Sequence, residues 1–157
     1  MPNDAPIPQW DQLPELTFLE KTAYIAYQLK VMADGTEAPV SHIFEPGMYI
    51  REIKIPAGIV MVGRPHIFGH RCELVSGSLL HVSEEGRRVI EAPFEMHTVP
   101  NYQLIVYTLT PIVGRTYHPN EDEERDVEVL ENKWFLPPDP ILQLGAMVHA
   151  RLTEDSP

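Results

Sequence analysis

From about residue 43 onward, apolar and polar side chains alternate in short runs, the pattern of half-buried strands. In 49–55, Tyr49, Arg51, Ile53 and Ile55 share one face of the expected strand, and the polar side chains Glu52 and Lys54 lie on the other. Turn signals at 56–58, 76–77 and 83–86 separate further strands, expected at 59–62, 73–75, 79–82, 88–90 and 102–110. Strands at this spacing predict an all-β fold, a small sandwich or barrel.

The segments on either side of this core have a different pattern. Apolar residues at helical spacing predict a helix over 15–33, with Gly35 as its stop, after a Pro-rich arm at 1–14. The tail from Trp134 onward, rich in proline, is expected to wrap around the core, and 141–150 to form a short strand or helix. We therefore divide the chain into an N-terminal arm and helix (1–42), a β-barrel core (43–118), and an acidic segment with a Pro-rich tail (119–157).

The charge is strongly negative, with 12 basic and 23 acidic side chains and a formal net charge of −11. More than half of it lies at 121–131, where seven acidic side chains accompany one arginine, a segment expected to be a solvated helix or loop face. An acidic metal site in this segment is an alternative, but nothing in the sequence fixes its geometry. Asn120 followed by Glu123 fits a helix N-cap with its capping-box acid. This balance argues against a nucleic-acid or anionic-membrane partner.

The cysteine count and the lengths of the apolar runs argue against several classes of protein. A single cysteine excludes an internal disulfide framework and a Cys-rich zinc site. The apolar runs are too short for a membrane-spanning helix, and the first residues do not have the pattern of a secretory leader. The expected location is the cytoplasm.

Three of the seven histidines stand in two neighbouring elements. His66 and His70 follow Arg64 in the stretch 58–77, and His97 lies in a later element, 93–101. A neutral imidazole carries a free nitrogen lone pair, which makes histidine the commonest metal ligand near neutral pH. The alternative is that each is an ordinary surface or hydrogen-bonded histidine. Cys72 shares strand parity with His70 and is expected to be a buried, inert thiol.

These two stretches resemble the paired motifs of the cupin superfamily. In the first motif, Gly58, His66 and Gly77 match, His70 takes the position of a glutamate, and Arg64 that of the first histidine. In the second, which departs from the family spacing by one residue at two places, the matching positions are Gly86, Pro93, His97 and Asn101. The resemblance covers roughly residues 45–112 and implies a small double-stranded β-helix, the cupin jelly-roll barrel, assembled as a homodimer. The stretch 47–70 also resembles small single-domain cupins encoded by tailed bacteriophages, which would add a virion-associated location.

The resemblance implies a metal site of three histidines: His66, His70 and His97. Imidazole ligands suit Fe, Ni, Cu or Zn, and the sequence does not choose between these divalent metals. Arg64 has no lone pair for a metal, but its guanidinium could bind a small-molecule carboxylate or phosphate as the substrate-binding residue. Alternatively, it pairs with an acid such as Glu73 or Glu95, and the metal has been lost.

Two functions stay open. One is a metal-dependent enzyme that acts on a small anionic substrate through the three-His site, with no catalytic base indicated beyond Cys72 or a nearby tyrosine. The other is a non-catalytic cupin, a binding or structural module of phage derivation. The helix and tail outside the core favour the second, because they could exchange between subunits.

Overall fold

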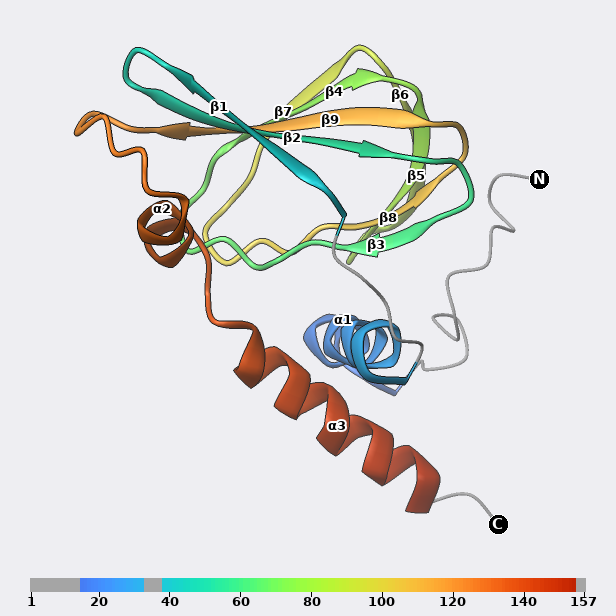
Figure 1. The fold of residues 1–157 in the computed structure, drawn as a ribbon. Helices are drawn as coiled ribbons and strands as arrows, with labels where there is room; N and C mark the ends of the chain where they lie inside the picture. The colour runs from blue at the N-terminus through green and yellow to red at the C-terminus, as the bar shows by residue number, and fades with distance from the viewer. Residues whose placement is uncertain (1–14, 33–37, 155–157) are drawn as a thin grey trace.

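The computed structural model describes residues 15–32 and 38–154. Figure 1 shows a β-barrel with helices along one side and one end. The strands in the described part of the chain are β1 (Val40–Glu45), β2 (Met48–Ile55), β3 (Val60–Val62), β4 (Arg71–Ser76), β5 (Ser78–Ser83), β6 (Gly86–Glu91), β7 (Phe94–His97), β8 (Ile105–Thr108) and β9 (Ile112–Pro119). The Pro-rich arm predicted over 1–14 lies outside the described residues.

The strands form two antiparallel sheets with the orders β1-β2-β9-β4-β7 and β3-β8-β5-β6. Most neighbours within a sheet are distant in sequence, as in a double-sheet jelly roll, where the chain passes from one sheet to the other. The prediction of an all-β, double-stranded β-helix barrel with an N-terminal helix and a C-terminal extension is therefore confirmed.

The barrel interior has an apolar end and a polar end. Its apolar core contains Ile55, Leu74, Leu79, Ile90, Val106 and Ile112. Ile55 pairs with Ile112 at one end of the β2–β9 ladder, and Tyr49 pairs with His118 near the other. Because alternate residues of a strand face the same side, His118 points inward like Ile112. The strands thus place histidine chemistry at the end opposite the apolar core.

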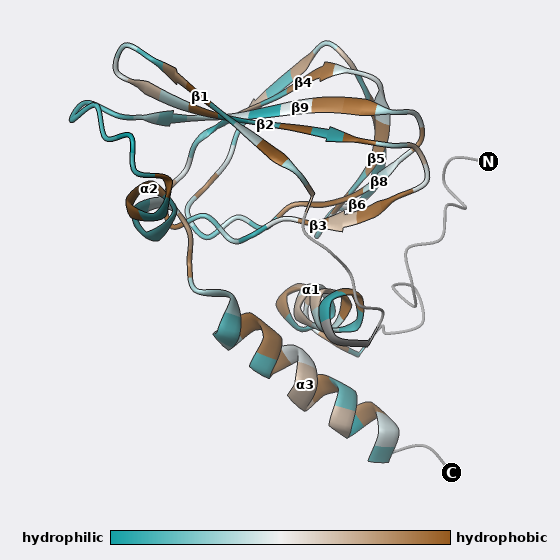
Figure 2. Cartoon of the chain, in the orientation of Figure 1, coloured by the Kyte–Doolittle hydropathy of each residue, from teal (hydrophilic) through white to brown (hydrophobic). Residues whose placement is uncertain are grey.

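Three α-helices in the described residues lie outside the barrel: α1 (Phe18–Tyr27), α2 (Val127–Trp134) and α3 (Pro138–Glu154). A π-helical stretch, Gln28–Met32, extends α1, so the predicted helix is confirmed as far as residue 32. Figure 1 shows α1 and α3 side by side below the barrel, and Figure 2 shows brown, hydrophobic residues interspersed with teal ones along both helices. No helix of the described residues is long and apolar enough to cross a membrane.

The predicted N-cap at Asn120 is wrong. The side chain of Asn120 bonds to the backbone of Glu124, which closes a loop instead of starting a helix. The helix begins later, where Asp126 caps α2 by accepting from the backbone of Glu128 at 3.0 Å. The acidic segment is therefore partly loop and partly helix.

Candidate functional site

Three histidines from two parts of the chain meet at the polar end of the barrel. His66 lies in the loop between β3 and β4, His70 directly precedes β4, and His118 is on β9. The ring centroids of His66 and His70 are 3.6 Å apart, and the rings of His66 and His118 are nearly coplanar. His70 and His118 are 5% and 0% exposed, and His66 is half-buried at the edge of the interior. We call these residues the histidine cluster.

The hydrogen bonds of the cluster indicate which ring nitrogen carries the proton. Nδ1 of His118 donates to the carbonyl of Tyr49 at 3.2 Å, and Nδ1 of His70 lies 3.0 Å from Oγ1 of Thr98 and 3.3 Å from the carbonyl of Phe68. Nε2 of His66 faces Nε2 of His118, and which of the two donates depends on the tautomer of His66. A neutral ring protonated at Nδ1 carries its lone pair on Nε2. Nε2 of His118 therefore carries a lone pair, whereas Nε2 of His70 faces Sγ of Cys72.

Burial keeps the cluster uncharged. Desolvation, with a smaller contribution from repulsion by His70, lowers the pKa of His66 to about 2 and that of His118 to about 3. Burial also lowers the pKa of His70. At pH 7 all three rings are neutral, because a charged ring would lose its hydration and repel its neighbours. Nε2 of His66 and Nε2 of His118 therefore face each other at 3.2 Å on two neutral rings.

Two protonated side chains, Cys72 and Tyr102, lie on the strands and loop beside the cluster. Sγ of Cys72 is 3.2 Å from Nε2 of His70, and burial raises the pKa of this thiol to about 12. The hydroxyl of Tyr102 is 2.6 Å from Nε2 of His81. Burial, with a contribution from Cys72, raises the pKa of Tyr102 to about 12. Both groups keep their protons at neutral pH, so Cys72 is a hydrogen-bond donor and a poor nucleophile.

The structure brings His66 and His70 together, but not His97. His97 pairs in register with Arg71, and Met96 pairs with Cys72. Since paired residues share a face, His97 lies on the outer face with Arg71, and its side chain is exposed. His118 takes the third place. His118 lies outside both sequence motifs, although its even spacing from Ile112 and Thr116 indicates an inward position on the strand.

Residues after α2 cover the cluster. The backbone of Ile67 donates to Trp134 at 2.8 Å, and Leu136 donates back to Pro65 at 2.9 Å. These bonds hold the Phe135 ring 4.3 Å from the His66 ring and the Trp134 ring 4.8 Å from the His118 ring, measured between centroids. Trp134 and Phe135 are buried. The expectation that the tail wraps the core thus has a specific form: it closes one end of the barrel.

Arg64 pairs with an acid, but a different one from those predicted. Its Nη1 donates to Oε2 of Glu131 on α2 at 3.2 Å. Glu73 accepts instead from Tyr117, and Glu95 pairs with Arg71 on the outer face.

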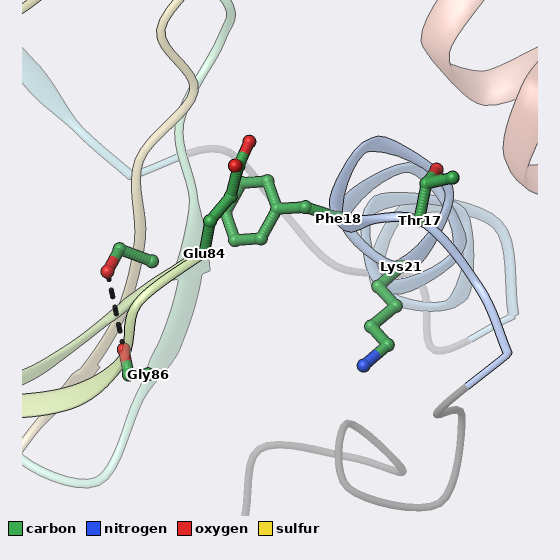
Figure 3. Close-up of a pocket in the computed structure, with 6 residues that line it drawn as sticks. Thr17, Phe18, Lys21, Glu84 and Gly86 are labelled. Atoms are coloured by element: carbon green, nitrogen blue, oxygen red, sulfur yellow. Dashed lines mark hydrogen bonds between the residues drawn. The ribbon is translucent and has the colours of Figure 1, made fainter.

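Within residues 15–32 and 38–154, no group of three or more His, Cys, Asp or Glu side chains is arranged to hold a metal ion. Two surface hollows lie away from the cluster. Figure 3 shows the first, where Phe18 of α1 reaches toward Glu84 in the β5–β6 turn. The second is lined by residues of β2, β4 and β9 at the apolar end, among them Ile55 and Ile112.

Comparison with known proteins gives similarity at the level of the fold. No family model matches the chain, and no curated protein matches it. A cupin-2 domain of an XRE-family transcriptional regulator from Enterobacter cloacae is 12% identical, with a TM-score of 0.44, over 52% of this chain and 95% of that chain. A cupin domain from Bordetella pertussis is 16% identical, with a TM-score of 0.41, over 54% and 98%. A protein with a double-stranded β-helix domain from Klebsiella pneumoniae is 12% identical, with a TM-score of 0.46, over 56% and 81%.

Proposed function

We propose that this chain is a metal-binding cupin that holds a divalent transition metal in its histidine cluster and acts on a small anionic molecule. The observation that supports the metal is the pair of Nε2 atoms of His66 and His118, 3.2 Å apart. When His66, like His118, carries its proton on Nδ1, the two Nε2 lone pairs face each other and repel, and a cation bound by both removes that repulsion. Burial opposes the alternative of a shared proton, because it lowers the pKa of both rings.

The donor set fits a metal in part. Zn–N bonds are about 2.0–2.1 Å long, so two imidazole nitrogens on a tetrahedral ion lie about 3.3 Å apart. The His66–His118 separation is close to this value. Metal-binding histidines also usually donate their second ring N–H to a carbonyl or carboxylate, as His118 does to Tyr49.

The third ligand in this proposal is His70, whose Nε2 now faces Cys72. A rotation of its ring away from the thiol would complete the set. His118 replaces His97 of the ligand set that the sequence implies, because His97 lies on the outer face. Iron, nickel, copper and zinc all suit three imidazoles.

Elemental analysis of purified protein tests the site. We expect close to one equivalent of Fe, Ni, Cu or Zn per chain in the parent and at least a tenfold loss in His66→Gln and His118→Gln. His97→Gln is the matched control, since it also removes one imidazole, and it should retain the metal. Equal metal content in all four proteins would refute the proposal. Loss in His97→Gln with retention in His118→Gln would restore the ligand set implied by the sequence.

When bound, the metal would supply Lewis-acid or oxygen-activating chemistry. Around it, the chain's own residues supply protons. Cys72 and Tyr102 remain protonated at neutral pH, and the Tyr102 hydroxyl and His81 share a hydrogen bond. This arrangement suits a donor of a proton to the bound molecule and leaves no strong base in contact with the cluster.

A non-catalytic binding or structural module is the second candidate, with phage derivation as its proposed origin. The burial of Trp134 and Phe135 over the cluster favours it, because these rings limit the entry of a substrate. Proton NMR of small carboxylates incubated in air with the metal-loaded protein separates the candidates. Consumption of any of them supports an enzyme, and binding without consumption supports the module.

A further inference from the structure

The carboxylate of Glu131 lies between two guanidinium groups at the edge of the histidine cluster. Its Oε1 accepts from Arg51 at 3.0 Å, and its Oε2 accepts from Arg64 at 3.2 Å. The Arg51 side chain is 13% exposed, and those of Arg64 and Glu131 are each 30% exposed. Glu131 comes from α2, which Figure 1 shows at the end of the barrel, whereas Arg51 is on β2 and Arg64 is in the loop after β3.

Phe135 positions both guanidinium groups. The central carbon of Arg51 is 4.6 Å from the centroid of the Phe135 ring, and that of Arg64 is 4.7 Å from it. A guanidinium stacked on an aromatic ring keeps its N–H groups directed outward at its edge, where a planar anion binds. The same ring contacts His66, so the two arginines border the cluster.

The donors at this place are not all used. Nε of Arg64 and Nε1 of Trp134 are buried and lack a hydrogen-bond partner. Glu131 takes only one N–H from each arginine, although a guanidinium can hold a carboxylate with two parallel hydrogen bonds. Two positive charges also face one negative charge. An unused buried donor and an excess positive charge both favour a further anionic acceptor.

We propose that Arg51 and Arg64 form a binding site for a small carboxylate or oxoanion, and that Glu131 occupies this site as an internal competitor. Because the Glu131 side chain is partly exposed, it can turn toward solvent and leave the arginines to the incoming anion. This deepens the proposed function, since it names the groups that would hold the anionic molecule. Anion binding by the arginines does not require the metal, so the two proposals are tested apart.

The test is a titration of chelator-treated protein with acetate, and separately with inorganic phosphate, at constant ionic strength. Binding is followed by the ¹⁵N NMR shifts of the arginine Nε groups. We expect Glu131→Gln to bind at least one of these anions at least tenfold more tightly than the parent, because it removes the competitor. Glu128→Gln is the matched control: it removes an equal charge from an exposed position of the same helix and should bind like the parent.

A second variant identifies the site. Glu131→Gln combined with Arg64→Gln should lose the gained affinity. The proposal is overturned if Glu131→Gln binds neither anion more tightly than the parent, or if the double variant binds as tightly as Glu131→Gln. If Glu131→Gln does not fold, Glu131→Asp takes its place, since the shorter side chain does not span both arginines. If elemental analysis finds no metal in the parent and Glu131→Gln still binds the anion more tightly, only the proposed metal site is refuted.

Discussion

At the scale of single residues, the histidines of the cluster have no acidic hydrogen-bond partner among residues 15–32 and 38–154, and burial keeps them neutral. This has a consequence for stability. In the unfolded chain these rings titrate near pH 6.5, whereas the pKa of His66 is lowered to about 2 and that of His118 to about 3 in the fold. Below pH 6.5 these histidines are protonated in the unfolded state but stay neutral in the native state. The free energy of unfolding therefore falls as the pH falls. The slope is about 1.4 kcal/mol per pH unit for each such histidine.

Denaturant titrations of metal-free protein between pH 5 and pH 7 measure this slope. We expect His118→Gln to reduce it by close to one proton in the acidic half of that range, because the variant has one buried base fewer. His97→Gln removes an exposed imidazole and should keep the slope of the parent. A parent whose stability is constant over this range, or a His118→Gln variant with the parent's slope, would show that the cluster is not buried in the neutral form.

At the scale of elements, the alternation of side chains along each strand explains most of what could be predicted from the sequence about strand positions and inward-facing residues. Alternation over 49–55 indicated the strand, and the parity shared by His70, Cys72 and Leu74 indicated the inner face. The same rule applies to β7, where Phe94 and Met96 are apolar and Glu95 and His97 are polar, and it favours an outward His97 over the motif spacing. The covering role of α2 was beyond prediction: it depends on contacts between residues 65–67 and 134–136, which local pattern does not specify. For the same reason Glu131 could not be distinguished from its six acidic neighbours.

The N-cap of α2 tests whether this helix holds its cover in place. Asp126→Ala removes the side-chain acceptor for the backbone of Glu128, at a cost of about 1 kcal/mol. We expect amide hydrogen exchange in 127–134 to accelerate about fivefold, because the helix opens more often. Thr17→Ala removes the corresponding cap of α1 and should leave exchange in α2 unchanged. Equal exchange rates in α2 for Asp126→Ala and the parent would mean that packing of Trp134 alone fixes the helix.

At the scale of the whole molecule, α1 joins the C-terminal helix to the barrel. Ile25 of α1 belongs to one buried cluster with Leu80 and Val82 of β5 and Ile105 of β8. On its other side, α1 packs against α3, where Tyr24 and Val148 are buried together. The two helices leave no room for a side chain at Gly145, where an added Cβ would collide with the backbone oxygen of Ala23 and lie 2.6 Å from Cβ of Tyr27. The helix pair and the barrel therefore share one continuous set of buried contacts.

Gly145→Val should consequently weaken the whole fold and not α3 alone. The added side chain has no space against Tyr27 and the backbone of Ala23, and such overpacking costs roughly 1–3 kcal/mol. We expect a lower Tm with a single cooperative transition, measured by calorimetry, because Ile25 transmits the loss to the barrel. Ala150→Val places the same side chain at an exposed position of α3 and should change Tm little, which separates packing from the helix propensity of valine. Two separate transitions in Gly145→Val, with the barrel melting at the parent's Tm, would show that the helix pair is an independent attachment.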